Sequence, residues 1–290
     1  MSDAPKTKQS TGKGALLARR IIAYTVLVVL IVISLLPFYL LIINATRGRV
    51  QAGIRWYPDQ YLLDNFRNLF SSTTQNNFGN VFRALGNSFI VAAGSCVLTV
   101  YFSALTAYAI HAYDFKLKKI AHTFILLIMM VPTQASAIGF YRFMNDLGLT
   151  DTYIPLIVPA VAAPATYFFM IQYMKSSLPL EIIEAARIDG CGEFKTFNRI
   201  IIPIMKPAFA VQAIFSFVAS WNNFFMPQMI LSSKEKYTIP IVLSLMRAET
   251  RIDYGVINLY IVIAVIPVIL IYLCLSKFII RGIALGSVKG

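Results

Sequence analysis

The chain has 290 residues, of which 58% are hydrophobic and 13% are charged. That is about half the charged fraction of a typical soluble domain. With a mean hydropathy of +0.68, the sequence has too little polar surface for a water-soluble fold, so the bilayer is its expected solvent. The net charge of +13 does not indicate nucleic acid as a partner, because no basic stretch is interleaved with base-stacking aromatic residues. In membrane proteins, Lys and Arg instead collect at cytoplasmic helix ends.

Cysteine and histidine usage predicts no disulfide framework, no metal site and no cofactor. Cys96 and Cys274 lie in apolar stretches, where cysteine behaves as a small hydrophobic residue. Cys191 lies in a polar loop that we expect in the reducing cytoplasm. The two histidines, His111 and His122, have no cysteine or carboxylate at metal-ligand spacing.

The first elements in chain order are a basic tail and an apolar run. Residues 1–20 contain five Lys and Arg residues and are predicted to be a cytoplasmic tail. Residues 21–43 carry no charge and would reach about 34 Å as a helix, enough for a hydrocarbon core of about 30 Å. The run is too long for the apolar core of a cleaved signal peptide, so we interpret it as the first membrane span.

Five further apolar runs of similar length follow, at residues 84–110, 120–140, 154–174, 207–231 and 257–280. Six spans place both termini on one side of the membrane. Of the 26 Lys and Arg residues, 16 fall in the segments that this topology puts on the same side as the termini. This bias predicts that both termini are cytoplasmic. We therefore expect an all-α polytopic membrane protein whose single transmembrane domain occupies residues 21–290.

The predicted spans lack charged residues in their interiors. Such charges are costly at the bilayer centre and usually mark function, so their absence argues against an ion-coupled carrier, although backbone carbonyls can also bind sodium. No phosphate-binding loop ending in Gly-Lys-Ser/Thr is present, and no His-Glu-x-x-His or Gly-x-Ser-x-Gly motif occurs. The chain is therefore not expected to be an enzyme, and any ATP hydrolysis would take place on partner subunits.

The predicted spans contain several prolines: Pro37, Pro132, Pro159, Pro164, Pro227 and Pro267. Each removes a backbone donor and can kink a helix. In lipid, such kinks usually face protein or a water-filled path, but prolines are also generally common in membrane helices. The sequence leaves both interpretations open at each position.

The segment 175–206 is the longest one predicted on the cytoplasmic side. Pro179 suits the first turn of a helix because its missing donor is not needed there, with Ser177 as the expected cap. Gly190 suits the left-handed residue that ends a helix. The pattern predicts a helix of about three turns, and a second short helix through Phe194 and Ile200 that ends before Pro203. Taken alone, the first helix could also lie flat on lipid headgroups.

This segment resembles the EAA loop of binding-protein-dependent ABC importer permeases. The matching residues are Glu184-Ala185-Ala186, Asp189-Gly190, Phe197, Ile200, Pro203 and Pro207. The resemblance continues at Asn87-Ser88, Ala107-Tyr108-Ala109, Leu147-Gly148-Leu149, Trp221-Asn222 and the tail from Arg281 to Gly290. The tail is similar to that of maltose-type carbohydrate permeases. Together these motifs extend over most of residues 80–290.

The resemblance implies a type I ABC importer permease fold in a heteromeric complex in the cell membrane. The expected partners are a sister permease, two ATP-binding cassette ATPases and an extracytoplasmic solute-binding protein. The transported solute would be a sugar or oligosaccharide. The short loop helix would dock on the ATPase, which assigns ATPase coupling to Glu184, Ala185, Ala186, Arg187, Asp189 and Gly190.

A polar group within the fifth predicted span is the candidate substrate path: Trp221, Asn222 and Asn223. Aromatic faces suit the C–H surfaces of sugars, and amides offer donors and acceptors to hydroxyls. The alternative is that these amides hold the two permeases together. For the whole chain, the alternatives are an ABC permease for another solute, an ion-coupled carrier and a non-transporting membrane scaffold.

Overall fold

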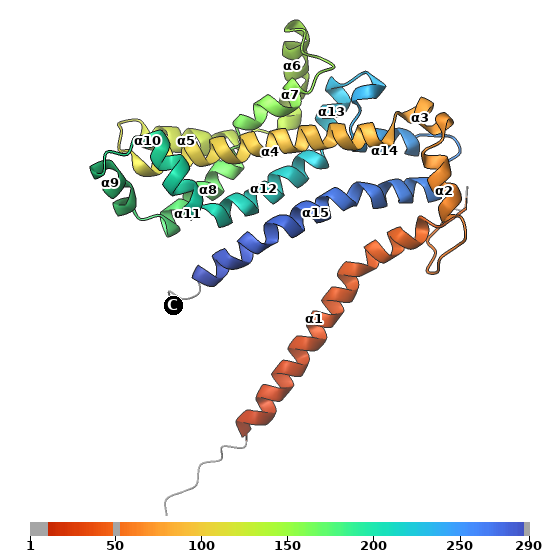
Figure 1. Ribbon diagram of the computed structural model, residues 1–290, viewed down its shortest axis with the longest axis horizontal. Helices are drawn as coiled ribbons and strands as arrows, with labels where there is room; N and C mark the ends of the chain where they lie inside the picture. The colour runs from red at the N-terminus through yellow and green to blue at the C-terminus, as the bar shows by residue number, and fades with distance from the viewer. Residues whose placement is uncertain (1–10, 49–52, 287–290) are drawn as a thin grey trace, which may run out of the picture. The chain divides into compact units, whose positions relative to one another are not determined.

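The computed structural model describes residues 11–48 and 53–286, and every regular element within those ranges is helical (Figure 1). The predicted all-α class is confirmed. Residues 1–10 of the predicted tail and residues 287–290 of the family-like C-terminus lie outside the described residues. Residues 11–20, predicted as tail, form the start of the first helix, α1 (Thr11–Asn44).

The chain divides into two compact units, residues 1–67 with 251–262 and residues 68–250 with 263–290. In the first unit, α1 is apolar on all sides from Ile21 onward, and most of its large side chains between Ile21 and Leu35 are about half exposed or more. A helix that is apolar all round suits lipid or a protein neighbour rather than water. At about 1.5 Å per residue, its 34 residues are more than sufficient to span a bilayer.

A buried amide fixes the turn that follows α1. Asn65 of α2 (Leu62–Leu69) is 1% exposed, and its amide donates to the carbonyls of Ala45 at 2.9 Å and Arg47 at 2.6 Å. Gly255, in the first turn of α15 (Tyr254–Gly286), lies so close that any Cβ would collide with the Arg47 carbonyl and the Asn65 side chain. Only glycine fits at this position.

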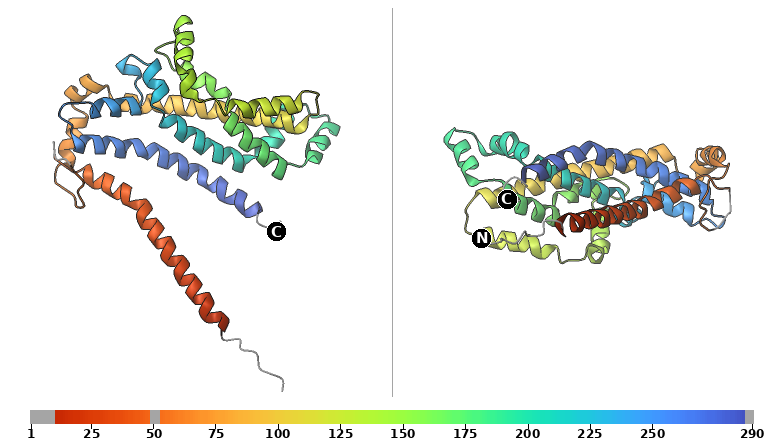
Figure 2. Two further views of the ribbon diagram at one scale, coloured as in Figure 1. Left: turned by 180° about the vertical axis from the view of Figure 1, so that it is seen from behind. Right: turned by 90° about the horizontal axis from the view of Figure 1, so that it is seen from below.

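The second unit is a helical bundle arranged around α4 (Val81–Ala112), which packs mainly on α8 (Pro164–Ser177) and α12 (Lys206–Trp221), as Figures 1 and 2 show. Small buried residues of α4, among them Ala92, Ala104 and Ala107, allow close helix approach, which drives association in membranes. The other elements are α3 (Ser72–Phe78), α5 (Lys118–Ile128), α6 (Thr133–Asp146), α7 (Ile154–Ile157), η1 (Val158–Val161), α9 (Leu180–Ile188), α10 (Glu193–Thr196), η2 (Phe197–Ile201), α11 (Ile202–Ile204), α13 (Phe225–Ile230), η3 (Lys234–Lys236) and α14 (Ile239–Arg247).

Among the described residues, four helical stretches are long and apolar enough to cross a bilayer: Leu16–Asn44, Ser72–Ala112, Ile154–Ser177 and Tyr254–Phe278. A fifth candidate is a pair of helices bent by 83°, Glu193–Ile204 with Lys206–Trp221. These stretches overlap five of the six predicted spans. The count of six and the cytoplasmic placement of both termini remain predictions.

Two predicted spans are interrupted in the structure. Residues 120–140 are divided between α5 and α6, and Pro132 precedes α6. Proline disfavours the helical conformation of the residue before it, so the chain turns between the two helices. Residues 207–231 are divided between α12 and α13, with residues 222–224 between them. Neither run contains Asp, Glu, Lys or Arg, so hydropathy alone does not reveal the breaks, although Pro132 and the Asn222-Asn223 pair lie at them.

The segment 175–206 is built into a hydrophobic core. Ile183, Phe197 and Ile201 are at most 1% exposed and belong to the same buried cluster as Tyr108 of α4 and Met170 of α8. The loop therefore packs directly on the helices that we expect to surround the transport path.

The predicted second helix does not end before Pro203. It begins at Glu193 and passes through the π-helical stretch Phe197–Ile201 into α11. The N–H of Ile202 donates to the carbonyl of Phe197, five residues earlier. This wider turn leaves Pro203 in the first turn of α11, where no donor is required.

Candidate functional site

The helix α9 is short and ends sharply. Its N-cap is Pro179, so the expected cap at Ser177 is wrong: Ser177 is the last residue of α8, and the chain is already extended at Pro179. Gly190 has φ +72°. Its N–H donates to the Arg187 carbonyl at 3.0 Å, and the N–H of Cys191 donates to the Ala186 carbonyl at 2.9 Å. This pair of bonds is the Schellman motif, and the predicted helix terminator is confirmed.

The two faces of α9 differ in burial. Ile183 and Ala186 are buried against the core, whereas Glu184, Ala185 and Asp189 are exposed. Ile188 is 86% exposed, the largest exposed fraction among the large apolar side chains of the described residues. Of the alanine pair predicted to contact another surface, only Ala185 is available, because Ala186 contacts the chain's own core.

Arg187 lies in a network that ties the segment 175–206, which we call the α9 loop, to the end of α4. Its Nε donates to Glu193 Oε1 at 2.7 Å, and its guanidinium carbon lies 5.2 Å from the centroid of the Tyr113 ring. The hydroxyl of Tyr108, on α4, donates to the other oxygen of Glu193 at 2.7 Å. We call these four residues the α9 latch.

Three members of the α9 latch were not predicted. Glu193, Tyr108 and Tyr113 lie 6 to 85 positions from their partners, too far apart for helical spacing to connect them. The one available signal is the Ala107-Tyr108-Ala109 motif, which by itself indicates only a family resemblance. Arg187 itself, predicted as an ATPase-coupling residue, is engaged within the chain.

Asp151 ties together two loops near the other end of α4. It has φ +56°, and its carboxylate accepts the N–H groups of Ser232 and Ser233, both at 3.0 Å, and Lys236 Nζ at 3.0 Å. Burial alone would raise the pKa of this carboxyl, but the hydrogen bonds from Ser233, Lys236 and Ser232 outweigh it and hold the pKa well below its usual range. We call Asp151, Ser232, Ser233 and Lys236 the Asp151 knot.

The loop that contains Ser232, Ser233 and Lys236 also attaches the Asp151 knot to α4. Asn87, in the second turn of α4, donates to the carbonyls of Glu235 at 2.8 Å and Tyr237 at 3.0 Å. Asn87 and Ala112 lie 25 residues apart, about 38 Å along a helix. Because Arg187 of the latch approaches the Ala112 carbonyl at 3.5 Å, the latch and the knot contact α4 far from one another.

The three predicted path residues have different environments. Trp221 is buried and stacks on Phe217, with ring centroids 5.4 Å apart. Asn222 donates to the carbonyl of Val218 on its own helix at 3.0 Å. Asn223 lines a cavity whose described lining includes neither Trp221 nor Asn222.

That cavity has a volume of about 550 Å³ and is lined by residues of α4, α6, α7, η1, α8, α12 and α13. Its apolar walls carry several uncharged polar side chains: Ser95, Thr99, Ser136, Thr166, Ser216, Ser220 and Asn223. Apolar walls with a few converging polar groups are typical of small-molecule sites. We call this the polar cavity.

Hydroxyl groups of α4 also donate hydrogen bonds to backbone carbonyls before Pro164, where the proline interrupts helical bonding. Pro164 has no N–H, so the carbonyl of Ala160 lacks its helical partner four residues on. Thr99 Oγ1 donates to that carbonyl at 2.9 Å. Ser95 donates to Leu156 at 3.1 Å and Ser103 to Ala163 at 3.3 Å. At least around Pro164, the proline-rich stretch faces protein and a cavity, one of the two interpretations left open by the sequence.

The fold and these features define a multi-pass membrane transport subunit. Residues 99–283, more than half of the chain, match the family of binding-protein-dependent transport system inner membrane components. The chain belongs to that family. It is therefore a permease component located in the membrane, as the resemblance of its loop predicted.

Several characterised relatives match over most of their length. The arabinooligosaccharides transport system permease of Bacillus subtilis is 35% identical, covering 88% of this chain and 91% of the relative. The trehalose/maltose transport system permease of Thermococcus litoralis is 30% identical, covering 94% and 98%. A crystal structure of a bacterial ABC transporter that imports the polysaccharide alginate has a chain of the same fold, with a TM-score of 0.75 at 20% identity, covering 94% of this chain and 99% of that one.

Proposed function

We propose that this chain is the membrane permease of an ATP-driven importer for a sugar or oligosaccharide. It would form the translocation path with a sister permease. Two ATPase subunits would hydrolyse ATP, since no phosphate-binding motif occurs in this sequence, and a solute-binding protein would deliver the substrate. The relatives named above, which transport arabinooligosaccharides and trehalose or maltose, support a carbohydrate over the alternatives of another solute or an ion-coupled carrier.

The single observation that carries this proposal is the construction of α9. A capped helix of nine residues buries one face in the core and presents Glu184, Ala185 and Ile188 outward. An apolar side chain beside a carboxylate suits a protein cleft with a basic group or backbone donors. Docking would desolvate Glu184, and removing one member of a buried pair typically costs about 3–5 kcal/mol.

The α9 latch supports transmission of movement from this helix to the path. Because Arg187 and Tyr108 share Glu193, a displacement of α9 would act on the end of α4. Further along α4, Thr99 lines the polar cavity. Exchange between inward- and outward-open states requires that ATP or substrate bind one state better than the other. In this proposal, the latch carries the movement of α9 to α4 when the transporter changes between these two states.

The polar cavity supports an uncharged polyhydroxylated solute. Its lining includes hydroxyl and amide groups, which together offer both donors and acceptors. No Asp, Glu, Lys or Arg is among the described residues that line it. Of the three predicted path residues, Asn223 is among the residues that line this cavity.

The test is reconstitution of the complete transporter in proteoliposomes with Glu184→Ala. We expect loss of ATPase association in a pull-down and loss of substrate-stimulated ATP hydrolysis, with normal membrane insertion. Glu235→Ala is the matched control, because this exposed carboxylate lies in the loop of the Asp151 knot. Wild-type association and transport in the Glu184 variant would contradict the proposal and favour a helix that merely lies on headgroups.

A further inference from the structure

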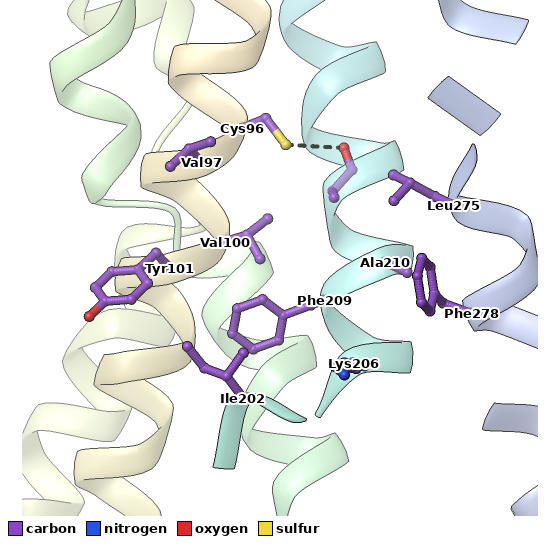
Figure 3. Close-up of a pocket in the computed structure, with 11 residues that line it drawn as sticks. Cys96, Val97, Val100, Tyr101, Ile202, Lys206, Phe209, Ala210, Leu275 and Phe278 are labelled. Carbon is purple, nitrogen blue, oxygen red and sulfur yellow. Dashed lines mark hydrogen bonds between the residues drawn. The ribbon is translucent and has the colours of Figure 1, made fainter. Parts of the chain in front are cut away.

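A second cavity lies among α4, α12 and the later part of α15. It has a volume of about 450 Å³. Figure 3 shows Val100 on α4, Phe209 on α12, and Leu275 and Phe278 on α15 around it. It shares no lining residue with the polar cavity.

Two of the polar side chains that line this cavity, those of Cys96 and Tyr101, form hydrogen bonds within the chain. The thiol of Cys96 donates to the Ala213 carbonyl at 3.4 Å, the dashed line in Figure 3, and the hydroxyl of Tyr101 donates to Asn198 at 3.3 Å. Lys206, which is exposed, is the one charged side chain among the described residues that line the cavity. An apolar chamber with a single cationic group at its edge has the polarity of a lipid-binding site.

A second lysine lies close to the same cavity. The ammonium of Lys277 is 5.2 Å from the centroid of the Phe278 ring, and that ring lines the cavity. Lys206 follows the α9 loop directly, at the start of α12. By the predicted topology, both lysines are therefore near the cytoplasmic surface, where anionic lipids attract basic groups.

We propose that this cavity binds an anionic glycerophospholipid. One acyl chain fills the apolar space between α12 and α15, and the phosphate lies against the ammonium groups of Lys206 and Lys277. Basic pockets between membrane helices on this side of a bilayer are suited to phospholipid headgroups. The long lysine side chains can reach the interface while their methylene groups cover apolar surface.

The size of the cavity favours an acyl chain over a protein helix. A helix about 10 Å across fills roughly 80 Å³ per ångström of its length. Even the whole empty space of the cavity, about 930 Å³, would therefore hold only about two turns of helix. A hydrocarbon chain is far thinner and can enter from the surrounding bilayer.

The test measures lipid retained by the complete transporter. The transporter is purified from nanodiscs of phosphatidylcholine containing a minority of phosphatidylglycerol, and bound lipid is counted by native mass spectrometry. We expect wild type to retain phosphatidylglycerol preferentially. Lys206→Gln should lower that retention about fivefold, as expected for one basic contact, and leave phosphatidylcholine unchanged. Lys195→Gln, which removes an exposed lysine outside the cavity, should behave as wild type.

A second variant tests the acyl-chain position. Ala213→Leu places extra carbon in the cavity without changing charge, and it should lower phosphatidylglycerol retention with both lysines intact. Retention of the two lipids by wild type in the proportion in which the nanodisc contains them, or equal phosphatidylglycerol retention by wild type, Lys206→Gln and Ala213→Leu, would overturn the proposal. So would efficient cross-linking of a cysteine at position 275 to the sister permease, because a protein segment would then occupy the cavity.

Discussion

The α9 latch and the Asp151 knot both use one carboxylate to hold a loop on α4, but they differ in what that carboxylate binds. Glu193 is bound by the side chains of Arg187 and Tyr108, and the Arg187 and Glu193 side chains are 37% and 39% exposed. Asp151 is bound by two backbone N–H groups as well as by the side chains of Ser233 and Lys236, and its own N–H donates to the carbonyl of Ile230 at 2.8 Å. Exposed ion pairs, which each carboxylate forms once, are worth about 0–1 kcal/mol. A hydrogen bond to a charged group is worth about 1.5–3 kcal/mol, and Asp151 accepts more of these from uncharged groups than Glu193 does.

This difference suggests that the two loops have different tasks. The α9 latch can open without unfolding a helix, because only side-chain bonds are broken. The Asp151 knot cannot open without releasing backbone bonds of two loops. We therefore expect the α9 loop to change its contacts during transport and the knot to stay closed.

The largest expected effect concerns the side of the membrane that each loop faces. In a cysteine-free background, a cysteine at position 235 should be modified by a membrane-impermeant reagent in intact cells, whereas one at position 195 should react only after permeabilisation. The reason is the excess of Lys and Arg in the segments around the α9 loop. Rapid external labelling at 195 would reverse the orientation.

Replacement of Gly190 by valine should be the most damaging change to coupling. Gly190 and Gly148 end α9 and α6 with the same pair of bonds, at φ +72° and +68°, and a Cβ would meet no atom within 4 Å at either position. Both Val variants thus bear a similar backbone cost of about 1–2 kcal/mol or more. We expect Gly190→Val to abolish substrate-stimulated ATP hydrolysis, and Gly148→Val to lower thermal stability while ATPase association persists.

One result would contradict this distinction between the ends of α9 and α6. If Gly148→Val released the ATPase as completely as Gly190→Val did, the two helix ends would not have separate roles. Pull-down of the ATPase and melting of the purified transporter distinguish the outcomes.

Asp151→Ala should destabilise the transporter by about 2 kcal/mol, since hydrogen bonds to a carboxylate are lost. Asp151→Asn should recover part of this loss, because asparagine tolerates the left-handed conformation and keeps one acceptor oxygen. Thermal melting in detergent checks the order wild type, Asn, Ala. An alanine variant as stable as the asparagine variant would show that the Asp151 bonds do not hold the loops.

The same carboxyl predicts a pH dependence. The pKa of Asp151 is lower in the folded protein than in the unfolded chain, so its contribution to stability is fully present above about pH 4 and is lost as the pH falls below it. The melting temperature of wild type should therefore fall more steeply than that of Asp151→Asn on acidification below about pH 4. Parallel curves would contradict this role.

Within the α9 latch, single substitutions should have smaller effects on stability than on coupling. Arg187→Ala and Glu193→Gln should each change stability by less than about 1 kcal/mol, yet each should reduce transport per ATP hydrolysed. The double variant should resemble either single variant, because both break the same contact. Additive losses would mean that Arg187 acts directly on the ATPase, as the family resemblance implied.

The smallest expected effect is on substrate preference. Asn223→Ala should change the relative uptake of sugar analogues, since Asn223 lines the polar cavity. Asn222→Ala should leave the order of analogues unchanged, because its amide bonds to its own helix. If Asn222→Ala changed the relative uptake of the analogues and Asn223→Ala did not, Asn222 rather than Asn223 would belong to the substrate path.

Local sequence patterns predicted the fold class and the α9 helix with few errors. Long uncharged runs can be satisfied only as helices in lipid, and Gly190 specifies a helix end because few other residues adopt its conformation. These features depend on each residue and its immediate neighbours. The same local reasoning misplaced the cap at Ser177 and did not divide the runs at residues 129–132 and 222–224, where the absence of charged residues made each run resemble a single span.

Tertiary structure alone decided which side chains meet. The sequence identified Glu184, Arg187 and Asn223 as candidates, but only the fold brought Arg187 to Glu193 and Tyr108, placed Asn223 in a cavity, and left Glu184 facing outward. The partners in the latch and the knot lie up to 85 residues apart, and contacts over such distances depend on how helices pack rather than on local propensity. The sequence therefore determined the helices and the chemistry available on them, whereas packing around α4 determined which of those groups act together.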